Sequence, residues 1–231
     1  MGYLISSQLF KFSKSKVWPI VTVIIASVTV LSNFIFDCFQ NHEPTPINNV
    51  FFDGDFLIID IAILVPLLLA IDFSSGSIVQ IISKGAEHAK YVITTELLVS
   101  VGAFLMILVG LGLYCAVYIP VFGMETVTCF RSPAGLALCL CSIMAICFAC
   151  TCFAQLIMCL SRKLSITLIA SVITPLALEI VARDTPLDPK VWDRSLVLSS
   201  FSTHLIMISC FLIAGFFFTA VSITALKKIS L

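Results

Sequence analysis

The sequence is short of charge. Only 11% of its 231 residues are Asp, Glu, Lys or Arg, whereas a soluble domain carries about 25%. Because 60% of the residues are hydrophobic, there is too little polar surface to cover a water-soluble globule. The formal net charge is zero, so no nucleic-acid partner is indicated. Composition therefore predicts an all-α, polytopic membrane protein.

Catalytic and nucleotide-binding motifs are also missing. The chain has no Gly-x-x-x-x-Gly-Lys-Ser/Thr loop to hold phosphates, no His-Glu-x-x-His and no Gly-x-Ser-x-Gly. His42, His88 and His204 are widely dispersed, and the paired glutamates and histidines that an intramembrane protease needs are not found within the apolar runs. We therefore expect no enzyme activity, metal or bound cofactor in this chain. If it takes part in ATP-driven transport, ATP and Mg²⁺ would belong to a partner subunit.

Cysteine is plentiful, with ten residues in the chain. No His or acidic residue is interleaved with the six that lie in one apolar run, so we expect them to pack as small apolar side chains; they are Cys139, Cys141, Cys147, Cys150, Cys152 and Cys159. Cys38 and Cys129 are predicted outside the membrane on the same face, but we do not expect them to form a disulfide.

Six apolar runs are predicted to cross the membrane, because about 20 helical residues span its hydrocarbon core. They are residues 17–36, 56–71, 91–119, 134–160, 164–181 and 201–226. Residues 1–16 mix apolar and basic side chains and predict an interfacial helix. Residues 183–200 are charged, contain Trp192, and predict short helices at the external surface.

The distribution of basic residues predicts the orientation, because Lys and Arg are enriched in cytoplasmic loops. With the N-terminus inside, nine basic residues fall on the cytoplasmic side: Lys11, Lys14, Lys16, Lys84, Lys90, Arg162, Lys163, Lys227 and Lys228. Four fall outside: Arg131, Arg183, Lys190 and Arg194. Both termini are therefore expected in the cytoplasm of a cell-membrane protein.

A polar interval between the second and third runs predicts a short cytoplasmic helix over residues 74–85. Ser74 or Ser75 can cap its start, and Gly85 is a natural stop. An apolar face is formed by Ile78, Ile81 and Ile82, spaced i, i+3 and i+4. This helix could serve as a handle for a cytoplasmic partner, or it could simply rest on lipid headgroups.

The interval from Gly76-Ser77-Ile78 through Ser83-Lys84-Gly85 to Tyr91, together with the six-span layout, resembles ABC-2 type transporter permeases. The resemblance implies that residues 74–85 are the coupling helix, which docks into a separate cytoplasmic ATPase through Ile78, Ile81, Ile82, Ser83, Lys84 and Gly85. It also implies that residues 1–16 form an elbow helix and that a second permease subunit, identical or closely related, completes the assembly.

Three acidic residues lie in or beside the apolar runs: Asp60, Glu96 and Glu179. A charge inside a membrane helix is costly, about 2.5–3.5 kcal/mol on insertion scales, and such residues usually face a cavity or a partner. One interpretation places them along a cargo pathway that favours cationic or amphipathic molecules. The other treats them as structural or interfacial acids.

The leading hypothesis is an ATP-driven exporter of an amphipathic or cationic peptide, or of a similar hydrophobic compound. Small six-span permeases of bacteriocin-immunity and peptide-export systems are the members that the chain resembles. The alternative is a passive channel, or a structural membrane subunit without an ATPase partner.

Overall fold

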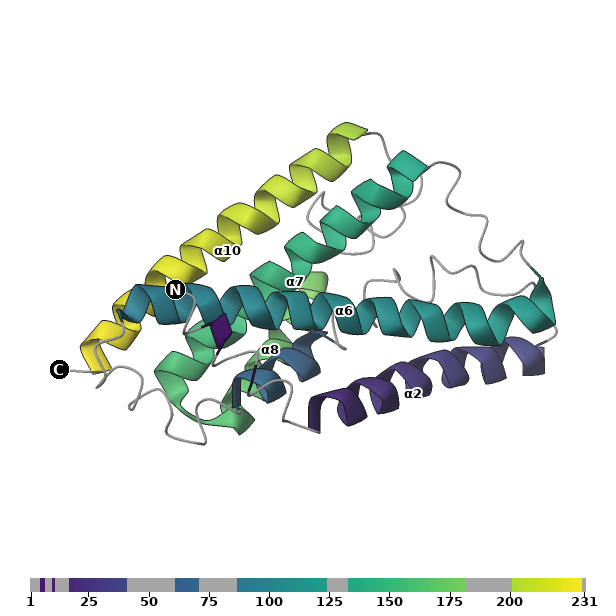
Figure 1. Ribbon diagram of the computed structural model, residues 1–231, viewed down its shortest axis with the longest axis horizontal. Coiled ribbons are helices and arrows are strands. Elements are labelled where there is room, and N and C mark those ends of the chain that lie inside the picture. The colour runs from purple at the N-terminus through teal and green to yellow at the C-terminus, as the bar shows by residue number, and fades with distance from the viewer. Residues whose placement is uncertain are drawn as a thin grey trace.

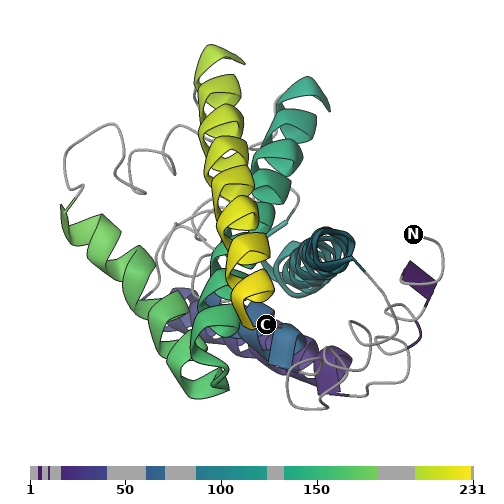
Figure 2. The same ribbon diagram turned by 90° about the vertical axis from the view of Figure 1, so that its left-hand side faces the viewer.

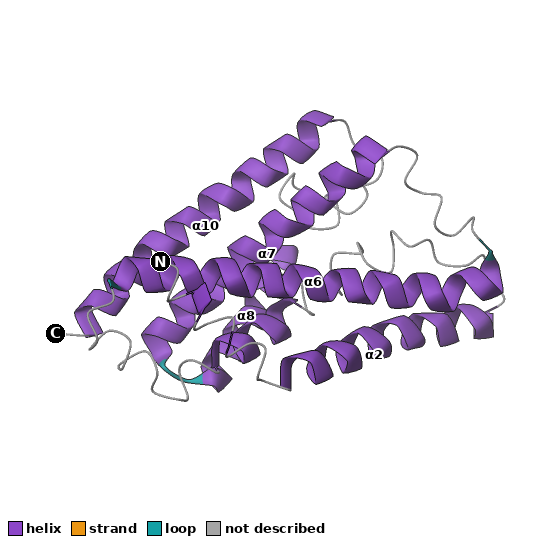
Figure 3. Cartoon of the chain, in the orientation of Figure 1, coloured by secondary structure: helices purple, strands orange, loops and turns teal. Residues whose placement is uncertain are grey.

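A computed structural model describes Ile5, Ser6, Phe10 and residues 17–40, 61–70, 87–123, 133–181 and 201–229. All of these residues are helical except Glu87, Gly123, Arg162 and Lys163, and Figure 3 shows no strand among them. The predicted all-α class is therefore confirmed for the described residues.

Five long helices make up most of this structure: α2 (Val17–Gln40), α6 (His88–Phe122), α7 (Pro133–Ser161), α8 (Leu164–Val181) and α10 (Phe201–Ile229). A shorter helix spans Ile61–Ala70. Each coincides with an apolar run of the sequence, because a helix satisfies its own backbone hydrogen bonds and can bury apolar side chains in lipid.

Three helical stretches are long and apolar enough to cross a membrane: His88–Phe122, Leu140–Ser161 and Leu205–Lys227. This finding supports a membrane protein. The predicted segments 74–85 and 183–200 lie outside the described residues, as do residues 56–60 and most of residues 1–16.

Helix α7 is the centre of the bundle. Within its apolar stretch 67% of the residues are buried, against 33% in α6 and 22% in α10. Figures 1 and 2 show α7 and α10 lying side by side, with α6 crossing them. Helix α2 runs along the half of α6 that ends at Phe122. The core contains buried side chains from α2, the Ile61–Ala70 helix, α6, α7 and α10, including Val30, Leu64, Val99, Ile146 and Met207.

The helix directions follow from which ends touch. Phe34, near the end of α2, contacts Tyr118 near the end of α6, so these two helices are parallel. Leu226, near the end of α10, packs with Tyr91 at the start of α6, so α6 and α10 are antiparallel. Cys159, near the end of α7, belongs to the same cluster, so α7 and α10 run in the same direction.

Two short segments bound the long helices. Gly123 closes α6 with a φ of 83°, a conformation that glycine adopts without strain, and its N–H bonds the carbonyl of Ile119 at 3.0 Å. Arg162 and Lys163 alone separate α7 from α8, and the Arg162 N–H bonds the Met158 carbonyl at 2.9 Å. The turn falls at the residues where the sequence predicts one.

The basic residues that the structure describes gather at one end of the bundle, which we name the basic end. It carries the exposed side chains of Lys90, Arg162, Lys163 and Lys227. Lys90 lies at the start of α6, the arginine and lysine between α7 and α8, and Lys227 near the end of α10. These elements meet at the left of Figure 1.

Candidate functional site

Glu96 is buried where α6, α7 and α10 meet. Its side chain is only 1% exposed, and its Oε2 accepts a hydrogen bond of 2.7 Å from the Thr219 hydroxyl of α10. The same hydroxyl oxygen lies 3.4 Å from Cys152 Sγ of α7. The Glu96 carboxylate is thus at the contact of three helices. It lies eight residues after His88, the first residue of α6 at the basic end.

The Thr219 hydroxyl has one proton to donate but two oxygen acceptors within hydrogen-bond distance. Its Oγ1 lies 2.7 Å from Glu96 Oε2 and 3.0 Å from the carbonyl oxygen of Gly215. A hydroxyl carries a single proton, and a hydrogen bond to a charged group is roughly twice as strong as a neutral one. The shorter contact, to the carboxylate, is therefore the one that we assign to the hydroxyl proton.

The helix register extends this contact into a layer. On α7, Cys152 and Cys159 lie two turns apart on one face; on α10, Thr219 and Leu226 do the same. Cys152 contacts Thr219, and Cys159 packs in the same cluster as Leu226. Because α7 and α10 are parallel, we infer from helix periodicity that buried residues of the turn between these two levels lie at the same interface.

Gln155 and Ser222 occupy that intermediate turn. Each lies three residues beyond Cys152 or Thr219, and both are 0% exposed. Neither amide atom of Gln155 has a hydrogen-bond partner, and the same is true of Ser222 Oγ and Glu96 Oε1. We name Glu96, Cys152, Gln155, Thr219 and Ser222 the polar layer.

The polar layer holds one acid and no base. The described contacts of the Glu96 carboxylate are with Thr219 and with the thiol of Cys152. Lys90 pairs with Glu87 at 2.9 Å, and the two side chains are 49% and 66% exposed. Among the described residues, the hydrogen-bond partners of an ionised Glu96 would therefore be a hydroxyl and a thiol.

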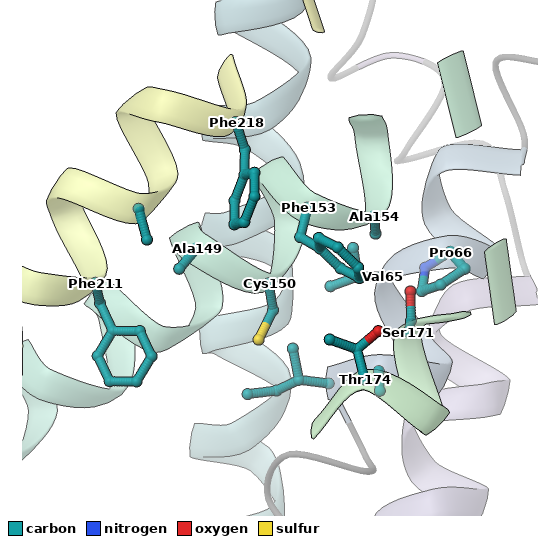
Figure 4. Close-up of a pocket in the computed structure, with 13 residues that line it drawn as sticks. Val65, Pro66, Ala149, Cys150, Phe153, Ala154, Ser171, Thr174, Phe211 and Phe218 are labelled. Atoms are coloured by element: carbon teal, nitrogen blue, oxygen red, sulfur yellow. The ribbon is translucent and has the colours of Figure 1, made fainter. Parts of the chain in front are cut away.

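An apolar cavity of about 250 Å³ lies on the opposite face of α7. Residues of α7, α10 and the Ile61–Ala70 helix line it, and Figure 4 labels Phe153, Phe218 and Pro66 among them. Among the described lining residues, hydroxyl groups come from Ser171 and Thr174 of α8 and a thiol from Cys150, and the buried Ser171 Oγ has no partner. This lining suits hydrocarbon, such as a lipid acyl chain or an apolar ligand.

The other predicted site residues are placed only in part. Glu179 lies in the last turn of α8, without a described side-chain position, and Asp60 immediately precedes the Ile61–Ala70 helix outside the described residues. The coupling residues also lie outside them: Ile78, Ile81, Ile82, Ser83, Lys84 and Gly85. The structure therefore gives a full environment to Glu96 alone.

The cysteines of α7 differ in exposure. Cys147, Cys152 and Cys159 are buried, while Cys141 is exposed. Cys38 is a free, exposed thiol on α2, and Cys129 is not among the described residues. Within the described part of the chain, no group of His, Cys, Asp and Glu could hold a metal ion.

Sequence reasoning overlooked three members of the polar layer. Gln155 is the single carboxamide in the run 134–160, and Thr219 and Ser222 are three residues apart in the last run. Isolated hydroxyls and amides are common between membrane helices, so each gave a weak signal. Pairing them with Glu96 required knowing which helices touch.

Comparison with protein-family models, with curated proteins and with solved structures finds no match to this chain.

Proposed function

We propose that this chain is the membrane-spanning permease subunit of an ATP-driven exporter of the ABC-2 type. In this proposal six helices cross the membrane, with both termini in the cytoplasm. Residues 74–85 form the coupling helix that a separate ATPase subunit grips. The cargo is an amphipathic or cationic peptide, or a similar hydrophobic compound.

The observation that carries the proposal is the basic end. The exposed Lys and Arg residues that the structure describes lie on elements that meet at one end of the bundle, as expected for a cytoplasmic face. Residues 71–86 precede Glu87 and His88, where α6 starts at that end. The coupling segment is therefore attached to the end that a cytoplasmic ATPase would approach.

The helix directions support the same topology. Starting from the basic end, α6 runs outward, α7 returns, α8 runs outward from the Arg162–Lys163 turn, and α10 finishes at the basic end. Helix α2 runs parallel to α6, which matches two outward spans separated by one inward span. The Ile61–Ala70 helix is placed as that inward span in the proposal.

Energy would enter through a difference in affinity. ATP favours one arrangement of the ATPase pair, and a coupling helix bound to that arrangement biases the membrane helices toward one of their own conformations. Large apolar side chains left exposed on α8 and α10, including Ile173, Ile213 and Phe216, would contact lipid or the second permease subunit.

Co-purification tests the proposal directly. The tagged chain should retain a cytoplasmic ATPase in mild detergent, and the double change Ile81→Asp and Ile82→Asp should release it, because two charges on the apolar face oppose docking. Lys163→Asp is the matched control, since it alters charge at the basic end but lies between α7 and α8.

Two results would contradict the proposal. One is the wild-type chain purifying without any ATPase, which favours the passive channel or structural subunit. The other is external labelling of a cysteine introduced at Ser83 or Lys84, because no cytoplasmic ATPase could reach a coupling helix on that face.

A further inference from the structure

The polar layer has hydrogen-bonding capacity that the protein does not use. Glu96 Oε1, both amide atoms of Gln155 and Ser222 Oγ are buried without partners. Buried polar groups in folded proteins nearly always find a partner. Several unpaired atoms within about one turn of each other along a buried helix interface therefore point to a bound species that supplies the missing contacts.

The charge of that species follows from Glu96. A carboxylate inside a membrane bundle needs a counter-charge or a proton, yet its described contacts are a hydroxyl and a thiol. From α7, the titratable groups near it are the thiols of Cys152 and Cys159. From α10, the facing side chains Thr219 and Ser222 do not titrate. Among these groups none supplies a positive charge.

The chemistry of the available atoms restricts the species further. Carboxylate, amide and hydroxyl oxygens are hard donors, which favour a proton or a hard cation over a transition metal. One carboxylate balances one positive charge. We propose that the polar layer is a binding site for a single small monovalent cation, a proton or Na⁺, held by Glu96 and supported by Gln155 and Ser222.

This site is independent of the transporter proposal, because it rests on the contacts of α6, α7 and α10 alone. An exporter, a channel or a structural subunit could each contain it. In this proposal Glu96, which is 1% exposed, binds a cation, whereas the alternative interpretation has it line a cargo pathway.

Two measurements on the purified full-length chain distinguish the two cations. Infrared difference spectra between wild type and Glu96→Gln, at neutral pH in K⁺ buffer, report a carboxylic C=O stretch if Glu96 carries a proton. Melting temperatures measured while Na⁺ replaces K⁺ at constant ionic strength report Na⁺ binding, for which we expect a rise of about 5 °C near saturation.

The matched control is Glu87→Gln, because Glu87 is exposed and pairs with Lys90. We expect Glu87→Gln to keep whichever signal the wild type shows, and Glu96→Gln to abolish it. The proposal is overturned if the difference spectrum between wild type and Glu96→Gln shows no carboxylic band and the wild type also shows no Na⁺-specific shift. A Na⁺-specific shift that survives in Glu96→Gln also overturns it.

A second variant protects the test if Glu96→Gln does not fold. Gln155→Met with Ser222→Ala keeps the carboxylate and removes the supporting donors and acceptors. We expect it to displace the carboxylic band or to weaken Na⁺ affinity roughly tenfold, the effect of one lost contact of moderate strength. An unchanged band and an unchanged Na⁺ midpoint in this variant overturn the assignment of the site.

Discussion

Helix α6 is held by different forces at its two ends. Near the basic end, Glu96 joins α7 and α10 through the Thr219 hydroxyl at 2.7 Å. About 27 Å further along the helix, Tyr114 and Tyr118 stack with ring centroids 4.0 Å apart. Phe34 of α2 meets Tyr118 edge-on at 5.6 Å. We name Phe34, Tyr114, Tyr118 and Phe122 the aromatic seam.

The difference shows what each contact can specify. Lipid is as apolar as the helices themselves, so association in a membrane depends on close packing and on hydrogen bonds between helices. The aromatic seam supplies buried area and ring contacts between α2 and α6. The polar layer supplies directional bonds, which fix the register of three helices but leave unpaired atoms.

The largest expected effect is in the aromatic seam. Tyr118→Ala removes a ring that is 0% exposed and should destabilise the protein by about 3–5 kcal/mol, through lost contacts and a cavity. Unfolding in mixed micelles by denaturing detergent measures the change. Ile213→Ala, at a side chain 70% exposed, should change stability by less than about 0.5 kcal/mol. Equal losses for the two variants would mean that α2 and α6 do not pack as described.

The next effect tests how closely α7 approaches α10. A Cβ at Gly215 would lie 2.5 Å from a ring carbon of Phe148, so Gly215→Ala must displace that ring. We expect a loss of about 1–3 kcal/mol, despite the better helix propensity of alanine. A Cβ at Gly112 meets nothing within 4 Å, so Gly112→Ala should be neutral or stabilising. A neutral Gly215→Ala would contradict the close packing of α10 against Phe148 of α7.

A smaller loss is expected when the bond between helices is removed. Thr219→Val keeps the shape of the side chain but deletes the donor to Glu96, and should cost about 1–2 kcal/mol in the same unfolding assay. Thr224→Val is the control, because the exposed Thr224 bonds the Ala220 carbonyl of its own helix. If both variants lose the same stability, the Glu96–Thr219 bond does not hold α6 to α10.

The smallest effect distinguishes bonds within a helix from bonds between helices. The buried Ser100 hydroxyl donates to the Glu96 backbone carbonyl at 2.6 Å, which satisfies the side chain without joining another helix. Ser100→Ala should therefore change stability by less than about 0.5 kcal/mol. A loss as large as that of Thr219→Val would place the stabilising bonds inside α6 rather than between helices.

Much of the architecture was predictable because apolar runs in a membrane protein leave few alternatives to a helix. The run 164–181 has the same bounds as α8, and 91–119 lies within α6. Membrane crossing by all six predicted runs, the elbow helix and the coupling helix stay predictions. The residues of the elbow and coupling helices are described in part or not at all. Several of the other apolar helices are too short for membrane crossing to follow from their length and composition.

The candidate site was predictable to a smaller degree. Glu96 was identifiable because a carboxylate in an apolar run is costly wherever the run lies. Gln155 and Ser222 were not, since an amide or a hydroxyl is common in such runs and sequence spacing along one helix says nothing about its neighbours.

Sequence alone determined that this chain is helical and apolar, with its basic residues unevenly distributed, because composition and periodicity act locally along the chain. Only the tertiary structure decided that α6 meets α7 and α10 at Glu96, because contacts between residues 123 positions apart depend on which helix faces pack. The unpaired atoms of the polar layer exist only in that packing, since each would be satisfied or exposed if its helix stood alone.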